Sequence, residues 1–319
     1  MTKLPHLLLG ALAITFAASA VPQARADNFP DRPIRLVVPF GVGGTSDIYA
    51  RVISRIIEEK KILPQPVVVL NVPGAGSAVG TRQVKDAAAD GYTLLFSHQA
   101  VITAGVMGLA DFGPEELEPI AEFGRFCSVY AVAEASPYKT FGDLLAAGKK
   151  NPGSIRESTN IGSVIHFASL MLSDKTGLNP RYVRASATPE RITHLLGGHA
   201  EVAVFSIAEL GAVKDNGVRV ILTMSPEPDR FAPNIPTARS LGYDTVFCVR
   251  NWIFAPKGTP AERVSAITGA LRKVFDTPEM KQEFEKFSSE ATLVVGTEFA
   301  DLVASEAKSL RAMSNLVPK

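Results

Sequence analysis

Residues 34–57 have the sequence IRLVVPFGVGGTSDIYARVISRII, which predicts a strand, a tight turn and a helix in that order. The β-rich run at 34–38 is typical of a buried strand. The glycine-rich segment 39–44 supplies the turn, and Thr45 or Ser46 can cap the helix that follows. In this helix, isoleucine, valine and tyrosine recur on one face, as expected where a helix packs on a sheet.

The same alternation of short β-rich runs with amphipathic helices continues along the chain. A second unit begins at residue 67, and a third strand covers residues 92–96. This order predicts an α/β fold with mostly parallel sheets. No flexible tether is visible in the composition, so the short strands near 126–132 and 246–255 are the best candidates for connections between two domains.

Three helix starts carry local signals. Thr140 and Asp143 have the spacing of a capping box, and Ser163 precedes a helix as a possible cap. The sequence TPAE at 259–262 predicts Thr259 as a cap, followed by a proline in the first helical position.

The first 26 residues have the pattern of a secretory signal peptide. A basic start at Lys3 precedes an almost unbroken apolar run of twelve residues, 7–18, and the segment ends in Ala-Arg-Ala at 24–26. The run is shorter than the roughly 20 residues that span a bilayer. The pattern therefore predicts export and a soluble, periplasmic mature protein.

Charge and composition exclude several kinds of partner. The full chain has 33 basic and 32 acidic residues, and removal of Lys3 and Arg25 with the leader leaves 31 against 32. Such a balance does not favour nucleic acid or an anionic membrane surface. The remaining length of about 290 residues suits two domains, and we expect a monomer.

Three turns lie at the carboxyl ends of predicted strands, where open α/β sheets bind ligands. They are residues 39–47, 71–80 and the end of 90–97. The free N–H groups and dipole at a helix start favour an anion, and glycine lets a ligand approach the backbone. The alternative is that these are ordinary turns between strands and helices.

Enzymatic sites and cofactors are not indicated. Glycines 74, 76 and 80 suggest a dinucleotide loop, but the acidic residue expected after the next strand is missing. The sequence has no G-x-S-x-G elbow, no H-E-x-x-H and no cysteine–histidine cluster. We therefore expect a binding protein without catalysis, metal or cofactor.

Taken together, the motifs resemble those of the TctC/Bug family of extracytoplasmic solute receptors, over essentially the whole mature sequence. The matching segments include FPDRPI (29–34), PF (39–40) with Gly43, Gly44 and Asp47, NVPGAG (71–76), DGYTL (90–94), NPG (151–153), Gly162-Ser163 with His166, LLGG (195–198) and Trp252.

The resemblance implies a two-domain periplasmic-binding-protein (Venus-flytrap) fold with two crossover strands. Residues 27–124 and 250–319 would form the first domain, and residues 125–249 the inserted second domain. A carboxylate of the ligand would be held by backbone groups at the first-domain turns. The implied ligand-binding residues are Phe40, Gly41, Val42, Gly43, Gly44, Thr45, Asp47, Ser97, His98, Asn160, Gly162, Ser163 and His166.

The segment Val183–Ala187 departs from the family pattern, in which an aromatic residue is usual. Arg184 and Ser186 are therefore added to the expected ligand contacts, since a guanidinium can bind a carboxylate through two hydrogen bonds. This gain suggests a ligand with a second acidic or polar group, although most such arginines are simply solvated.

The two cysteines, Cys127 and Cys248, each fall in a predicted crossover strand. A disulfide between them is expected if their Cα atoms approach within roughly 7 Å. The alternative is two buried free thiols.

The resemblance implies that the protein captures a small organic carboxylate and delivers it to the membrane permease subunits of a tripartite tricarboxylate transporter. A ligand-sensing receptor for a membrane signalling partner is an alternative from a second class. An exported hydrolase is a third, which lacks a recognisable nucleophile or metal set.

Overall fold

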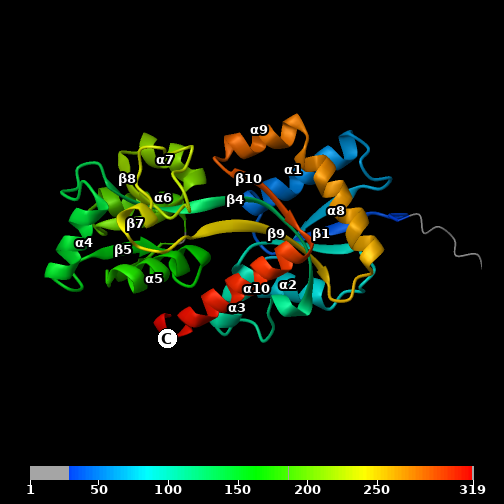
Figure 1. The fold of residues 1–319 in the computed structure, drawn as a ribbon, viewed down its shortest axis with the longest axis horizontal. Helices are drawn as coiled ribbons and strands as arrows, with labels where there is room; N and C mark the ends of the chain where they lie inside the picture. The colour runs from blue at the N-terminus through cyan, green and yellow to red at the C-terminus, as the bar shows by residue number, and fades with distance from the viewer. Residues whose placement is uncertain (1–28, 186, 318–319) are drawn as a thin grey trace, which may run out of the picture.

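The computed structural model describes residues 29–185 and 187–317, which form two lobes joined by two long crossing segments (Figure 1). The first lobe begins with β1 (Ile34–Val38), α1 (Thr45–Glu59), β2 (Val67–Asn71), α2 (Ala78–Lys85), β3 (Thr93–Ser97) and α3 (Ala100–Val106). The predicted signal peptide, residues 1–26, lies outside the described residues.

The chain then crosses to the second lobe and returns. The crossing strand and the second lobe comprise β4 (Leu117–Ala133), α4 (Phe141–Lys150), β5 (Arg156–Thr159), α5 (Val164–Thr176), β6 (Arg181–Arg184), α6 (Thr188–Leu196), β7 (Val202–Ser206), α7 (Leu210–Asp215) and β8 (Val218–Thr223). The return comprises β9 (Cys248–Pro256), α8 (Ala261–Phe275), α9 (Pro278–Lys286), β10 (Glu290–Val295) and α10 (Gly296–Ala312).

The strands form one continuous path in the order β2-β1-β3-β9-β4-β7-β5-β6, with β8 and β10 also paired to β4. In the first lobe, β1 pairs in parallel with β2 and β3, whereas β9 is antiparallel to both β3 and β4. The second half of β4 pairs with β7 and β8 in the second lobe. This arrangement confirms the predicted α/β architecture with two crossover strands.

The crossing strands are joined covalently. Cys127 on β4 lies opposite Cys248 on β9, and the two form a disulfide. The pair sits where the β4–β9 ladder ends and β4 begins to pair within the second lobe, starting at Ser128.

The core follows the sequence pattern. The apolar face predicted for α1 is buried, including Tyr49, Ile53 and Ile56, and packs on the sheet of the first lobe. Trp252 on β9 is fully buried against Phe254 and Phe299, which makes it a core residue of the first lobe.

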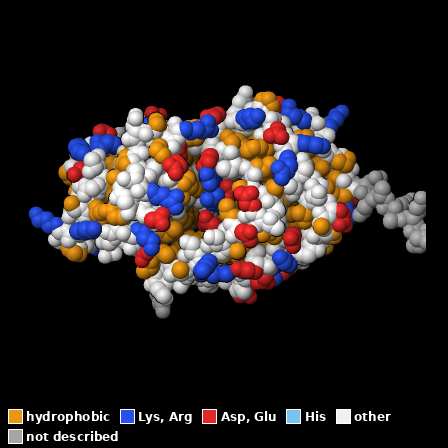
Figure 2. Space-filling model, in the orientation of Figure 1, with side chains coloured by type: hydrophobic (Ala, Val, Ile, Leu, Met, Phe, Trp, Pro, Cys, Tyr) orange, Lys and Arg blue, Asp and Glu red, His pale blue; other side chains and the backbone are white. Residues whose placement is uncertain are grey.

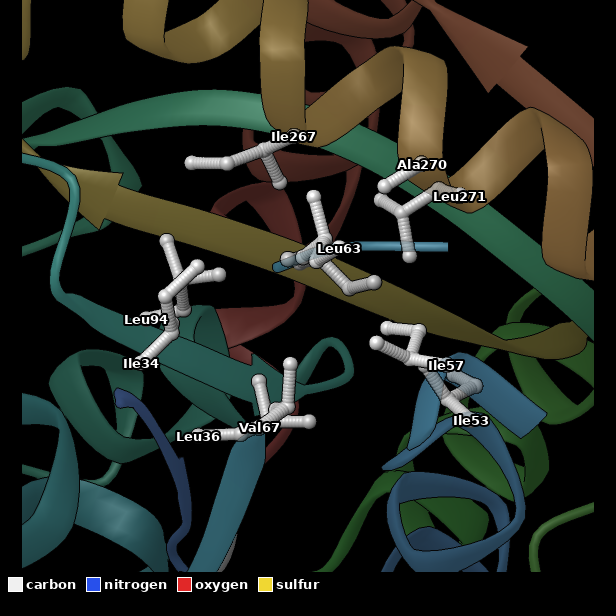
Figure 3. Close-up of a pocket in the computed structure, with 11 residues that line it drawn as sticks. Ile34, Leu36, Ile53, Ile57, Leu63, Val67, Leu94, Ile267, Ala270 and Leu271 are labelled. Carbon is white, nitrogen blue, oxygen red and sulfur yellow. The ribbon is translucent and has the colours of Figure 1, made fainter. Parts of the chain in front are cut away.

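One small cavity of about 20 Å³ remains in this core, between α1, α8 and the sheet (Figure 3). Its walls are aliphatic, with Ile53 and Ile57 on one side and Ile267 and Leu271 on another. A void of this size holds at most one water and offers no polar partner. It is a packing defect and is unsuited to a solute.

The predicted helix caps can be compared with the structure. Gly44, and not Thr45 or Ser46, occupies the N-cap of α1, and Ser163 occupies the N-cap of α5 but its side chain makes no cap bond. The capping box of Thr140 and Asp143 is confirmed, since each side chain bonds the backbone N–H of the other. The predicted cap at Thr259 is wrong, because α8 has Pro260 at its N-cap and the Thr259 hydroxyl donates to the Pro256 carbonyl instead. The Thr259 hydroxyl therefore closes a tight turn after β9, although the sequence pattern predicted that it would cap the helix.

Candidate ligand site

The first glycine turn connects β1 to α1 and is held from below by one carboxylate. Asp47 is 1 % exposed and accepts hydrogen bonds from Gly43 N at 2.9 Å and Asn71 Nδ2 at 2.9 Å. Arg51 Nε lies 3.0 Å from the same carboxylate. Burial alone would raise the pKa of Asp47, but these bonds hold it below its usual value. Asp47 thus faces the turn and supports it from beneath.

The upper side of this turn is open. Val42 is 75 % exposed, and a Cβ added at Gly41 or Gly43 would meet no atom within 4 Å. Gly43 has a φ of +83°, a conformation that glycine adopts without strain. Gly44 occupies the N-cap of α1, and no side chain caps the first N–H groups of that helix.

The third strand brings a second turn beside the first. His98 follows β3 and stacks on the Phe40 ring, with a centroid separation of 4.5 Å and an interplanar angle of 9°. The Nδ1 atom of His98 accepts from Ala100 N, and burial lowers the pKa of this histidine to about 4. At neutral pH the ring is therefore uncharged and carries its proton on Nε2. Ser97 is fully buried, and its hydroxyl has no hydrogen-bond partner among the described residues.

The turn before α5 in the second lobe has the same hydrogen-bond pattern as the turn between β1 and α1. Gly162, with a φ of +87°, donates its N–H to His166 Nδ1 at 3.1 Å, as Gly43 donates to Asp47 four residues further on. Ser163 occupies the N-cap of α5 without a side-chain cap bond. His166 is fully buried, and burial lowers its pKa to about 4. The support beneath this turn is thus a neutral imidazole instead of a carboxylate.

The two lobes make contact at the Asn160–Ser163 turn. A Cβ added at Gly162 would lie 2.9 Å from the Cε of Met107, which follows α3 in the first lobe. Met107 is the C-cap residue of α3, so this contact places the Asn160–Ser163 turn against the C-terminal end of that helix. In Figure 2, charged side chains of both signs gather on the face between the two lobes.

Arg184 ends β6 and lies in register with Thr159, the last residue before the Asn160–Ser163 turn. Its side chain is exposed and has no hydrogen-bond or ion-pair partner within residues 29–185 and 187–317. Ser186, the other expected contact from this segment, lies outside the described residues.

The structure forms two groups of expected residues, one in each lobe, and gives their members different positions. Val42 lies at the surface of its turn and Phe40 and His98 are half-buried, whereas Asp47 and His166 support the backbone from the interior. Reasoning from the residues missed the roles of Asn71 and Met107 in arranging the turns. The sequence signal for Asn71 was its place at the end of a strand, and Met107 carried no signal.

Comparison with known proteins identifies the family. Residues 50–315 match the model of the tripartite tricarboxylate transporter family receptor, TctC. The chain belongs to this family. The receptor is 30% identical to the protein BugT of Bordetella pertussis over 306 residues, which cover 93% of this chain and 91% of the relative.

Solved structures agree with this assignment. A TctC solute-binding protein from Polaromonas is 27% identical, has a TM-score of 0.78, and covers 90% of the receptor with 99% of its own chain. MatC from Rhodopseudomonas palustris, solved with bound malate, has a TM-score of 0.74 at 24% identity, covers 90% of the receptor with 100% of its own chain, and shows that the fold is shared.

Two further findings concern the described part of the receptor. None of its helices is long and apolar enough to cross a membrane. Its histidine, cysteine, aspartate and glutamate side chains form no group of three or more that could hold a metal ion. The exposed groups of the first turn are main-chain N–H groups and neutral side chains, and Arg184 on β6 carries a guanidinium without a partner among the described residues.

Proposed function

We propose that this receptor binds a small organic carboxylate between its lobes and delivers it to the permease subunits of a tripartite tricarboxylate transporter in the bacterial membrane. The supporting observation is that α1 and α5, one from each lobe, both start at glycine turns without a side-chain cap. The first N–H groups of a helix have no partner within the helix, and the helix dipole favours negative charge there. Two such helix starts suit an anion between them.

We propose that capture is reversible and takes place in the periplasm, with the receptor as a monomer. Hydrogen bonds to a charged group contribute about 1.5–3 kcal/mol each, so a few of them supply the roughly 8 kcal/mol of micromolar binding. Closure of the lobes around the ligand would then change the surface offered to the permease. No bond is made or broken, and the ligand leaves unchanged.

A thermal-shift screen tests this proposal. The mature protein, refolded to remove carried ligand, is melted with mono-, di- and tricarboxylates, including malate and adipate, and with their neutral amides. A ligand that binds only the folded state adds about 2.7 kcal/mol of stability at a hundredfold excess over Kd. We expect a clear rise in melting temperature with at least one acid and none with its amide.

Two results would contradict the proposal. One is the absence of a shift with every acid in the panel. The other is chemical conversion of the bound acid during incubation, detected by NMR of the released compound. Such conversion would indicate that the protein is an enzyme. Uptake of the labelled acid by vesicles containing the permease, dependent on added receptor, tests delivery.

We further propose that Arg184 binds a second acidic group of the ligand. Its position one strand from the Asn160–Ser163 turn, its exposure and its lack of a described partner support this role. Among the expected contacts it is the one residue with an unpaired full charge, since Asp47 is already engaged.

Arg184→Gln is therefore expected to weaken binding of a dicarboxylate about tenfold or more, because a charge-assisted bidentate pair is lost. Binding of the matching monoamide should change little. Isothermal titration of both ligands with both proteins gives a coupling energy between the guanidinium and the second carboxylate. Equal losses for the two ligands would remove Arg184 from the recognition of that group.

A further inference from the structure

The side chain of Gln99 makes hydrogen bonds to β9 beyond the point where the backbone pairing of β3 with β9 ends. β3 pairs with β9 up to Ser97, which lies opposite Trp252. The backbone then turns away at His98 to begin α3. Gln99, fully buried, donates from Nε2 to the Cys248 carbonyl at 2.7 Å, and its Oε1 accepts from Arg250 N at 3.2 Å.

These two hydrogen bonds hold the start of β9, at Cys248 and Arg250, close to the point where the two lobes are joined. The pairing of β9 with β4 ends at Cys248, which is joined by the disulfide to Cys127. From Ser128 onward, β4 pairs with the strands of the second lobe. Gln99 therefore holds the first-lobe end of the segment that connects the lobes, while its neighbour His98 stacks in the ligand turn.

The start of β9 is also held by ion pairs of Arg250. The guanidinium of Arg250 bonds both carboxylate oxygens of Glu122, at 3.1 and 2.9 Å, and its Nε lies 3.3 Å from Glu306 on α10. Glu122 is fully buried and also accepts from the Thr292 hydroxyl on β10 at 2.8 Å. The anchor thus joins β4, β9, β10 and α10 within one lobe.

We propose that Gln99 is a positioning residue that couples the Ser97–His98 turn to the crossing strands. Because its carboxamide binds β9 through both a donor and an acceptor, movement of the turn toward a ligand moves β9 at the point where the lobes are joined. The reverse also holds, so bending of the strands changes the position of the turn. This inference rests on the proposed function for its purpose, but its test does not require a known ligand.

The test compares Gln99→Leu with the wild type and with Thr259→Val. Leucine removes both bonds at similar size, whereas Thr259→Val removes a buried hydroxyl bond at the opposite end of β9. The described residues contain no free cysteine, so spin labels introduced at the exposed Lys150 and Lys273 report the distance between the lobes. Hydrogen exchange reports the Arg250 amide.

In the ligand-free protein we expect Gln99→Leu to broaden the interlobe distance distribution and to speed exchange of the Arg250 amide about tenfold, the effect of one lost hydrogen bond. Thr259→Val should leave both unchanged. Gln99→Met removes both bonds with a flexible side chain of similar size, so it should give the same broadening, and it carries the test if the leucine variant does not fold. A wild-type distribution in the variants would overturn the coupling, even if a carboxylate binds normally.

Discussion

Replacing Glu157 with glutamine is expected to stabilise the receptor, by an amount that grows as the pH rises from about 4.5 to about 8. Glu157 lies on β5, is fully buried, and accepts a hydrogen bond from the Ser169 hydroxyl at 2.7 Å. No ion pair to it is formed within the described residues. Burial therefore raises its pKa to about 8, against the opposing effect of the Ser169 bond.

The sign follows from linkage between protonation and folding. Between the usual glutamate pKa and about 8, the folded state keeps a proton that the unfolded state releases, so wild-type stability falls as pH rises. The loss is about 1.4 kcal/mol per pH unit and reaches a few kcal/mol at the upper end. Glutamine has no proton to lose, so the two proteins should be similar near pH 4.5 and differ most at pH 8 and above.

Denaturant unfolding of both proteins between pH 5 and 9 measures this difference. Glu201→Gln is the matched control, since Glu201 directly precedes Val202, the partner of Glu157 on the next strand. Partial burial opposes ionisation of Glu201, but hydrogen bonds from Arg156 keep its pKa below the usual value. This control should lose stability at neutral pH and recover toward wild type as the pH falls. A pH-independent gap between wild type and Glu157→Gln would refute the assignment of a protonated carboxyl.

Asp47→Ala is expected to cost the receptor both stability and ligand binding. The substitution leaves Gly43 N, Arg51 and Asn71 without the acceptor that they share. Hydrogen bonds to a charged group contribute about 1.5–3 kcal/mol each, but these donors are partly exposed and can bond water instead, so a total loss of about 1–3 kcal/mol is expected. Since the same bonds shape the turn between β1 and α1, binding of any acid found in the screen should weaken about tenfold or more.

The exposed Asp301 on α10, replaced by alanine, controls for loss of an aspartate alone. Urea unfolding gives the stability of both variants, and isothermal titration with the identified acid, at a temperature where both are folded, gives the affinity. The contribution of Asp47 is present at neutral pH and is lost as the pH falls through its lowered pKa. If Asp47→Ala binds the acid as tightly as wild type, the carboxylate does not shape the site.

Much of the fold was predictable because it depends on local patterns. The β-rich run at 34–38, the glycines after it and the apolar face of α1 lie within about twenty-five residues, and the structure has all three. The capping box at Thr140 is equally local. Prediction failed at Thr259, where the competing partner was the carbonyl of Pro256 at the end of a strand.

The turns at the strand ends were predictable from the sequence, but the tasks of their residues were not. The sequence placed Asp47 and His166 near ligand turns, yet whether a polar side chain faces the cleft or the interior depends on its hydrogen-bond partners. For Asp47 these include Asn71, 24 residues away. For Gln99 they lie 149 and 151 residues away, on β9. Such partners are not visible in local spacing.

The sequence by itself determined the alternation of strands and helices, the glycine turns at strand ends and the family, because each depends on neighbouring residues or on motif order. Only the tertiary structure decided that Cys127 faces Cys248, that Glu157 has no ion-pair partner among the described residues, and that the turn at Gly162 contacts Met107 in the first lobe. The physical reason is that pairing and desolvation are set by what the fold brings into contact. A carboxyl group ionises readily beside Arg51, as Asp47 does, and retains its proton at neutral pH when it is buried beside Ser169, as Glu157 is.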